Sequence, residues 1–219
     1  MSTTIHINGN LIYTATSSGL NIYDTYTDEL YAYINQSEGF SAVFGNDVVL
    51  YLGTPQNGLR TLYFDCVSGS TSLPIDLTSC LNNLNIPLTS NIIQYIHGDE
   101  QSIGVCTSSG VDYHRFGPNG FHSSTVISGT NRCFVTSQYI YYTKPDSLNK
   151  ADVRWDWVTP GTSYIIGGTI FETEVSFNDL YVIENTNYNT IYCATSSGVY
   201  VIDEETTLSG NYTRYLSYT

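Results

Sequence analysis

The residues best suited to chemistry in this chain are few and scattered. The four histidines are His6, His97, His114 and His122, and none lies four residues from another or near a cysteine at metal-ligand spacing. No G-x-S-x-G nucleophile elbow is present, and no serine or cysteine is visibly paired with a histidine. The sequence therefore predicts no catalytic residue, no metal site and no cofactor.

Carboxylates give equally little support for an enzyme. Glycoside hydrolysis requires a pair of carboxyl groups that flank the scissile bond. Among the strands expected to line the centre of the fold, only "FNDLYV" carries an acid, Asp179. An enzyme with carboxylates on the irregular loops "VSGSTSLPIDLTSCLNN" or "WVTPGTSYIIGG" is kept as the third alternative, because both loops are long enough to cover a binding site.

Two tryptophans are the strongest binding candidates. Trp155 and Trp157 are two residues apart, so they share one face of any strand they occupy. Large aromatic side chains stack on sugar rings or anchor protein partners, but they also fill gaps between packed sheets. The packing interpretation is favoured, and binding through these tryptophans is the alternative.

Five cysteines are present without a C-x-x-C pair. Cys66 and Cys80 bracket a polar loop and could close it as a disulfide under oxidising conditions. Cys106, Cys133 and Cys193 fall within expected strands, where we expect small buried apolar side chains.

The overall charge excludes one class of partner. Seven Lys and Arg against twenty Asp and Glu give a net charge of −13, which would repel nucleic acid and anionic membranes. The start "MSTTIHING" has no signal-peptide pattern, and no apolar run is long enough to span a membrane. We therefore expect a protein made in the cytoplasm, with no nucleic-acid partner and no membrane insertion.

The elements that must position these residues are repeated. "IYTATSSGLNIYD" at 12–24 returns as "IYCATSSGVYVID" at 191–203, with eight of thirteen positions identical. A threonine before a polar turn marks five copies, with spacings of 38, 53, 36 and 52 residues: Thr16, Thr54, Thr107, Thr143 and Thr195. The "TSSG" segments are interpreted as turns rather than ligand contacts.

Each copy contains an apolar strand, a turn, a Tyr-rich strand, a second turn and a third strand. Gly9, Gly45 and Gly98 are expected to supply a positive φ to the first turn. Segments such as "ELYAYIN", "GFHSSTVIS" and "TRYLSYT" provide a fourth strand. The last strand, 213–219, either completes the first unit or belongs to the last one.

Five four-stranded antiparallel units in 219 residues predict an all-β, five-bladed β-propeller. The single domain spans 1–219, with approximate blades at 1–38, 39–90, 91–131, 132–175 and 176–219. A β-sandwich gives no reason for a five-fold period, and a solenoid would have closer repeats. The copies at 12–24, 50–65 and 191–203 also resemble the "IYVGT-x-x-GL-x-x-YD" blade motif of sensor- and ligand-type propellers, which implies the fold and leaves function open.

Three functions follow from these observations. The first is a non-catalytic interaction or structural module with a protein partner or larger assembly. Its Tyr-, Ser- and Asn-rich, Lys-poor composition resembles that of virion accessory proteins, such as tail, fibre or capsid-decoration components.

The second is a lectin that binds cell-surface glycans between blades. Its candidate polar contacts differ from blade to blade: Asn21, Arg60, Asp112 and Tyr200. The third is the glycoside-active enzyme.

Overall fold

The computed structural model describes residues 4–46, 48–67, 72–117, 120–128, 132–152, 166–172, 176–185, 188–205 and 213–218. Across these ranges the chain is all-β, apart from two 3₁₀ helices of one turn. Its strands form five sheets, which we number 1 to 5 in chain order: four have four antiparallel strands, and sheet 1 has four antiparallel strands with a fifth, parallel strand at its edge. The predicted pattern of three strands followed by a fourth is confirmed.

Sheets 1 and 2 come from the first 83 residues. Sheet 1 consists of β1 (Thr4–Asn8), β2 (Leu11–Thr16), β3 (Gly19–Asp24) and β4 (Leu30–Asn35). Sheet 2 consists of β5 (Ala42–Gly45), β6 (Val49–Gly53), β7 (Leu59–Tyr63) and β9 (Asn82–Asn83). Between β7 and β9 lie η1 (Phe64–Val67), β8 (Ile75–Asp76) and η2 (Thr78–Cys80). Strand β8 pairs in parallel with β4, so this connection covers the outer edge of sheet 1.

Sheets 3 to 5 are regular meanders. Sheet 3 contains β10 (Ile93–Gly98), β11 (Ser102–Thr107), β12 (Gly110–Gly117) and β13 (Gly120–Ser128). Sheet 4 contains β14 (Arg132–Val135), β15 (Tyr139–Lys144), β16 (Ser147–Asp152) and β17 (Ile166–Glu172). Sheet 5 contains β18 (Phe177–Glu184), β19 (Tyr188–Thr195), β20 (Gly198–Glu205) and β21 (Thr213–Tyr218). The last strand, β21, pairs with β20 and therefore belongs to the last sheet.

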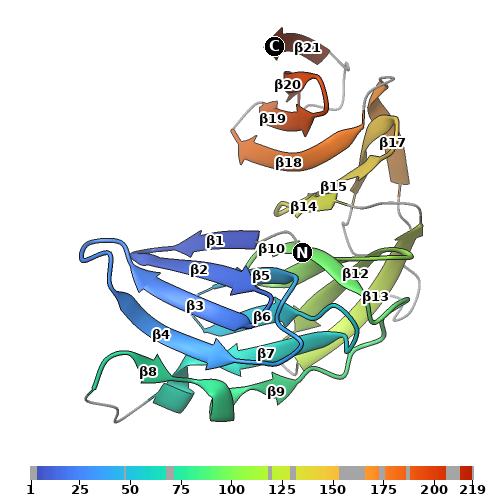
Figure 1. Ribbon diagram of the computed structural model, residues 1–219. Helices are drawn as coiled ribbons and strands as arrows, with labels where there is room; N and C mark the ends of the chain where they lie inside the picture. The colour runs from blue at the N-terminus through green and yellow to red at the C-terminus, as the bar shows by residue number, and fades with distance from the viewer. Residues whose placement is uncertain are drawn as a thin grey trace.

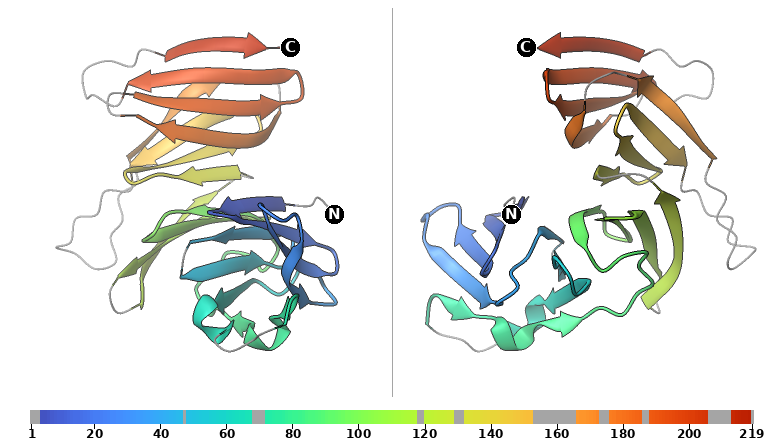
Figure 2. Two further views of the ribbon diagram at one scale, coloured as in Figure 1. Left: turned by 90° about the vertical axis from the view of Figure 1, so that its left-hand side faces the viewer. Right: turned by 45° about the vertical axis from the view of Figure 1, so that its right-hand side comes forward.

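The sheets are arranged side by side around an arc (Figures 1 and 2). The first strand of each sheet contacts the first strand of the next, in the order β1, β5, β10, β14 and β18. These first strands therefore form the inner side of the arc, which we call the hub. No comparably extended contact joins sheet 1 to sheet 5 among the described residues, and these two sheets border the opening of the arc.

The repeated "TSSG" segment has a defined structural role. In the first copy, Thr16 donates from Oγ1 to the Gly19 carbonyl at 3.0 Å and accepts from the Ser18 N–H at 3.3 Å. Gly19 has a φ of 139°, and a side chain there would collide with the Ile34 carbonyl on β4. The same Thr-to-Gly hydrogen bond recurs from Thr107 and Thr195. The interpretation of this motif as a turn is confirmed.

Two details of the repeat differ from the sequence prediction. Gly9 has a positive φ of 56°, but Gly45 and Gly98 do not. Gly98 is required for close packing instead, because a Cβ there would lie 2.3 Å from the Ser102 carbonyl oxygen on the paired strand and 3.0 Å from the Phe44 ring. The anchor of the fourth copy is also shifted by one residue. Thr16 pairs with Gly19 across the turn of the first copy, and Lys144 pairs with Ser147 across the turn of the fourth. The equivalent of Thr16 is therefore Lys144 rather than Thr143.

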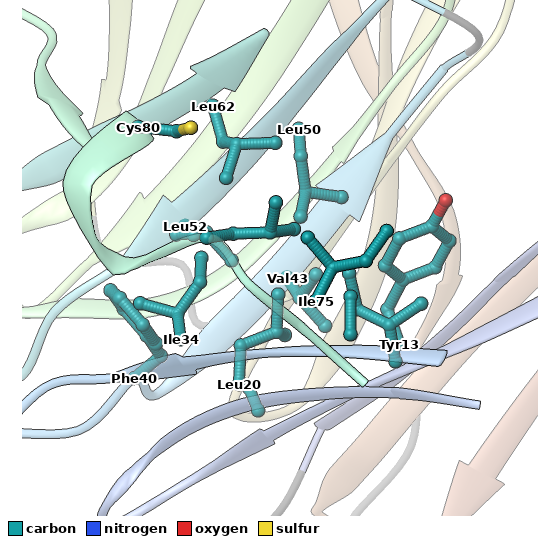
Figure 3. Packing of buried hydrophobic residues seen from close by; sticks show 14 residues of the cluster. Tyr13, Leu20, Ile34, Phe40, Val43, Leu50, Leu52, Leu62, Ile75 and Cys80 are labelled. Carbon is teal, nitrogen blue, oxygen red and sulfur yellow. The ribbon is translucent and has the colours of Figure 1, made fainter. Parts of the chain in front are cut away.

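The core lies between consecutive sheets. We call the side of a sheet toward the next sheet its forward face and the opposite side its backward face. The forward face of sheet 1 packs Tyr13, Leu20 and Ile34 against Val43 and Leu52 on the backward face of sheet 2 (Figure 3). Both faces of the internal sheets are buried in this way. This explains why their strands are apolar at successive positions rather than alternating.

The cysteines occupy two kinds of place. Cys66 and Cys80 form a disulfide that links η1 to η2, with their Cα atoms 6.0 Å apart. Cys106, Cys133 and Cys193 are free and buried, as expected from their positions in strands. Within the described ranges, no helix has the length and apolar character needed to cross a bilayer.

Candidate functional site

A row of aromatic rings follows the hub, one from the first strand of each sheet. Neighbouring ring centroids are 3.7 to 5.3 Å apart along the series His6, Phe44, His97, Phe134 and Tyr181. We call these the hub rings. Phe44 and Phe134 are 7% and 8% exposed. The hub rings therefore form a continuous series of aromatic contacts from sheet 1 to sheet 5.

The two hub histidines hold adjacent sheets together as neutral imidazoles. Nε2 of His6 lies 2.8 Å from the Gly45 carbonyl on sheet 2, and Nδ1 of His97 accepts the Val135 N–H from sheet 4 at 3.1 Å. Burial lowers the pKa of His97 to about 3, and the neighbouring His6 acts in the same direction. Burial also lowers the pKa of His6. These histidines are structural at neutral pH.

The remaining sequence candidates for chemistry do not converge. The Asp179 side chain is 61% exposed and its carboxylate lies 4.0 Å from the Arg132 guanidinium. Within the described ranges, no group of three His, Cys, Asp or Glu side chains is placed to hold a metal. His114 is buried in β12, and burial lowers its pKa to about 4. His122 lies in β13, and Trp155 and Trp157 lie outside the described residues.

A polar groove of about 340 Å³ opens at the outer edge of sheet 2. It lies between the β6–β7 turn and the segment that leads from β9 toward sheet 3. Its lining contains four carboxamide side chains and one guanidinium: Asn57, Asn83, Asn85, Asn91 and Arg60. We call it the asparagine groove.

The walls of the asparagine groove are fixed by backbone and side-chain hydrogen bonds. The Leu84 N–H donates to the Leu59 carbonyl at 3.1 Å, and the Gly58 N–H donates to the Asn91 carbonyl at 2.9 Å. On the far side of the 84–91 segment, Thr89 donates from both N–H and Oγ1 to the Asp112 carboxylate at 2.9 Å. The groove is thus preformed, because sheets 2 and 3 both hold its segment in place.

Arg60, which lines the groove, has one side-chain nitrogen without a partner among the described residues. Nε of Arg60 is buried and makes no hydrogen bond to the part of the chain that the structure describes. Nη2 of Arg60 lies 3.5 Å from Oε1 of Glu38. The same oxygen accepts a hydrogen bond from Gln36, and Oε2 of Glu38 accepts one from Asn57. A buried donor without an acceptor costs about 1–3 kcal/mol, so this atom is a cost to the folded state.

The polar third-strand residues singled out in the sequence have different roles. Asp112 is 1% exposed and anchors Thr89, so it is structural. Asn21 lies on β3 and Tyr200 on β20, away from the groove. Only Arg60 lines the groove. The asparagines of the groove were not predicted, although the run "LNNLNIPLTSN" at 81–91 is rich in carboxamides and is a usable signal.

Comparison with known proteins supports the fold. No protein-family model matches the chain, and no curated protein matches it. Among solved structures, Hsv2 of Kluyveromyces lactis is similar over 99% of this chain and 64% of its own, with a TM-score of 0.63 and 10% identity. The extracellular domain of BT4673 from B. thetaiotaomicron is similar over 99% of this chain and 27% of its own, with a TM-score of 0.59 and 18% identity.

PorZ, a surface component of the type-IX secretion system of Porphyromonas gingivalis, gives a similar result. It matches 94% of this chain and 26% of its own, with a TM-score of 0.61 and 13% identity. The chain therefore spans less than two thirds of each of these three structures. At such low identities the likeness establishes a propeller-like, all-β fold and nothing about function.

Proposed function

We propose that the chain is a five-bladed β-propeller that works as a non-catalytic binding module, with the asparagine groove as its ligand site. The observation that carries this proposal is a preformed groove lined by four carboxamide side chains and by Arg60. The five sheets of the described residues support the blade count. The hub rings support a binding role, because they occupy the positions that a propeller glycosidase would give to its carboxylates.

The chemistry of the groove favours a carbohydrate, the lectin alternative of the sequence analysis. A carboxamide offers an acceptor oxygen and two N–H donors, which match hydroxyl groups that both donate and accept. Arg60 and Glu38 balance each other in charge, and the net charge of −13 disfavours an anionic ligand. A volume of about 340 Å³ is within the range of small-ligand sites.

A neighbouring pair of asparagines provides a matched test. Asn83 lines the groove, whereas Asn82 precedes it on β9, is absent from the lining and donates to the Cys80 carbonyl. We expect the protein to bind on a glycan array, and Asn83→Ala to weaken binding of the strongest oligosaccharide about 10-fold in isothermal titration, the loss of roughly one good hydrogen bond. We expect Asn82→Ala to bind within about two-fold of the unchanged protein.

Two results would count against this ligand. An array with no binder at high protein concentration would remove carbohydrate binding, and binding to unglycosylated extended peptides would reassign the groove to a protein partner. Equal losses in Asn82→Ala and Asn83→Ala would place the site elsewhere. A role as a virion accessory protein stays a prediction from composition, and we attach no residue to it.

A further inference from the structure

Among the residues that the structure describes, the first and last sheets each leave one apolar face without a neighbouring sheet. The residue that precedes each hub ring lies on the backward face of its sheet. In sheets 2 to 5 this residue is 5% or less exposed: Val43, Ile96, Cys133 and Leu180. In sheet 1 the same position is Ile5, and it is 63% exposed. Ile7, the residue after the ring, is also 63% exposed, while its equivalents Val135 and Val182 are 2% and 4% exposed.

The last sheet shows the reverse. The residue paired with each hub ring on the second strand is Tyr13, Tyr51, Gly104, Tyr141 or Tyr192. These residues face forward and are buried in sheets 1 to 4, where Tyr13 is 2% and Tyr141 0% exposed. In sheet 5, Tyr192 is 37% exposed, and Tyr181 and Ile183 beside it are 58% and 42% exposed.

The two open faces are the two halves of an interface that the chain already forms four times. In the described ranges, no sheet packs on the backward face of sheet 1 or on the forward face of sheet 5. In every formed interface, the second strand of one sheet contacts the first strand of the next: β2 with β5, β6 with β10, β11 with β14, and β15 with β18. The missing member of this series is β19 with β1.

We propose that β19 packs on β1 of the same chain, so that the Tyr192 side of sheet 5 covers Ile5 and Ile7 of sheet 1 in a fifth sheet-to-sheet interface. This inference rests on the proposed five-bladed ring and is independent of the ligand in the asparagine groove. Both faces border the same opening of the arc (Figure 2). Because one chain carries both, they meet at an effective concentration that a second copy would reach only in concentrated solution.

The existing interface between sheets 3 and 4 shows which side chains should meet when sheet 5 packs on sheet 1. Cys106, two residues after Gly104, has its Sγ 3.0 Å from Sγ of Cys133 across that interface. The equivalent positions are Ala194, two residues after Tyr192, and Ile5. A Cβ placed on Gly104 would also lie against Cys133 and Val135, the equivalents of Ile5 and Ile7. The fifth interface should therefore place Ala194 beside Ile5.

A paired cysteine substitution tests this contact. The variant Ile5→Cys with Ala194→Cys is oxidised with copper phenanthroline, and the link is located by mass spectrometry of non-reduced peptides. We expect most of the protein to carry a link between positions 5 and 194 within a monomer. The control pair is Ile5→Cys with Tyr26→Cys, since Tyr26 is 80% exposed in the β3–β4 turn. A link between two chains, or no more linkage than in the control pair, would overturn the proposal.

The unchanged protein provides a second test if the double variant does not fold. Tetranitromethane nitrates accessible tyrosines, and sedimentation equilibrium gives the mass of the species treated. We expect a monomer in which Tyr26 is nitrated at least ten times faster than Tyr192. Similar rates for both tyrosines, or protection of Tyr192 only in a dimer, would contradict closure within one chain. Glycan binding measured on the same sample reports separately on the groove.

Discussion

The first and last repeats have closely matched sequences and opposite patterns of burial. Segment 12–24 packs Tyr13 and Ala15 against its neighbour and leaves Ile12 half-buried. Segment 191–203 packs Ile191 and Cys193, both 0% exposed, and leaves Tyr192 open. The comparison shows that each repeat carries two apolar faces because a repeat inside the array needs both. Which face is buried in the arc depends on the position of the sheet, and the residues alone do not decide it.

The largest expected effect is the loss of a forward-facing tyrosine at either end. If the fifth interface forms, Tyr192→Ala removes a buried ring just as Tyr13→Ala does, and we expect each variant to lose about 3 kcal/mol or more of unfolding free energy. Urea denaturation monitored by circular dichroism measures both variants.

The same pair distinguishes a closed ring from an open arc. A loss below about 1 kcal/mol for Tyr192→Ala, together with a large loss for Tyr13→Ala, would show that the face of sheet 5 is exposed in solution. Tyr26→Ala is the control for an exposed tyrosine, and we expect it to change the unfolding free energy by less than about 0.5 kcal/mol.

A smaller, pH-dependent effect separates the internal hub ring His97 from His6 at the edge of the arc. The pKa of His97 falls from 6.5 to about 3 on folding, so between these values only the unfolded chain binds the proton. Stability is therefore complete above pH 6.5 and decreases as the pH falls, by up to about 1.4 kcal/mol per pH unit from this site. We expect His97→Phe to remove that part of the slope.

His6→Phe should have a weaker effect in the same direction, because burial lowers the pKa of His6 while its hydrogen bond to the Gly45 carbonyl opposes that shift. Denaturation curves recorded from pH 7 to pH 4 give the slopes. An unchanged slope in His97→Phe would mean that His97 is accessible to protons in the folded protein.

The sequence was a good guide to the sheets because the repeat determines local structure. The Thr16–Gly19 turn and its copies combine a side-chain hydrogen bond with a backbone angle that favours glycine, and both requirements are visible as "TSSG". The buried free cysteines could be predicted for a similar reason, since they lie in strands apolar at successive positions. Gly45 and Gly98 were misassigned because each lies in close contact with the second strand of its own hairpin, and a glycine needed for that contact looks the same in the sequence as one needed for a positive φ.

The asparagine groove was harder to predict because it depends on contacts distant in sequence. Arg60 meets Asn83 through the β7–β9 pairing and meets Glu38 through the connection between sheets 1 and 2. Neither pairing follows from the repeat, since β9 has only two residues and belongs to the least regular sheet. The hub rings were also invisible as a set, because the repeat conserves their position but varies their residue type among His, Phe and Tyr.

Small-angle X-ray scattering of the unchanged protein tests the central claim most directly. The account predicts a monomer whose scattering fits a ring closed between sheets 1 and 5, with a radius of gyration smaller than that calculated for the arc. A monomer whose profile matches the arc, or a particle with the mass of two chains, would contradict it.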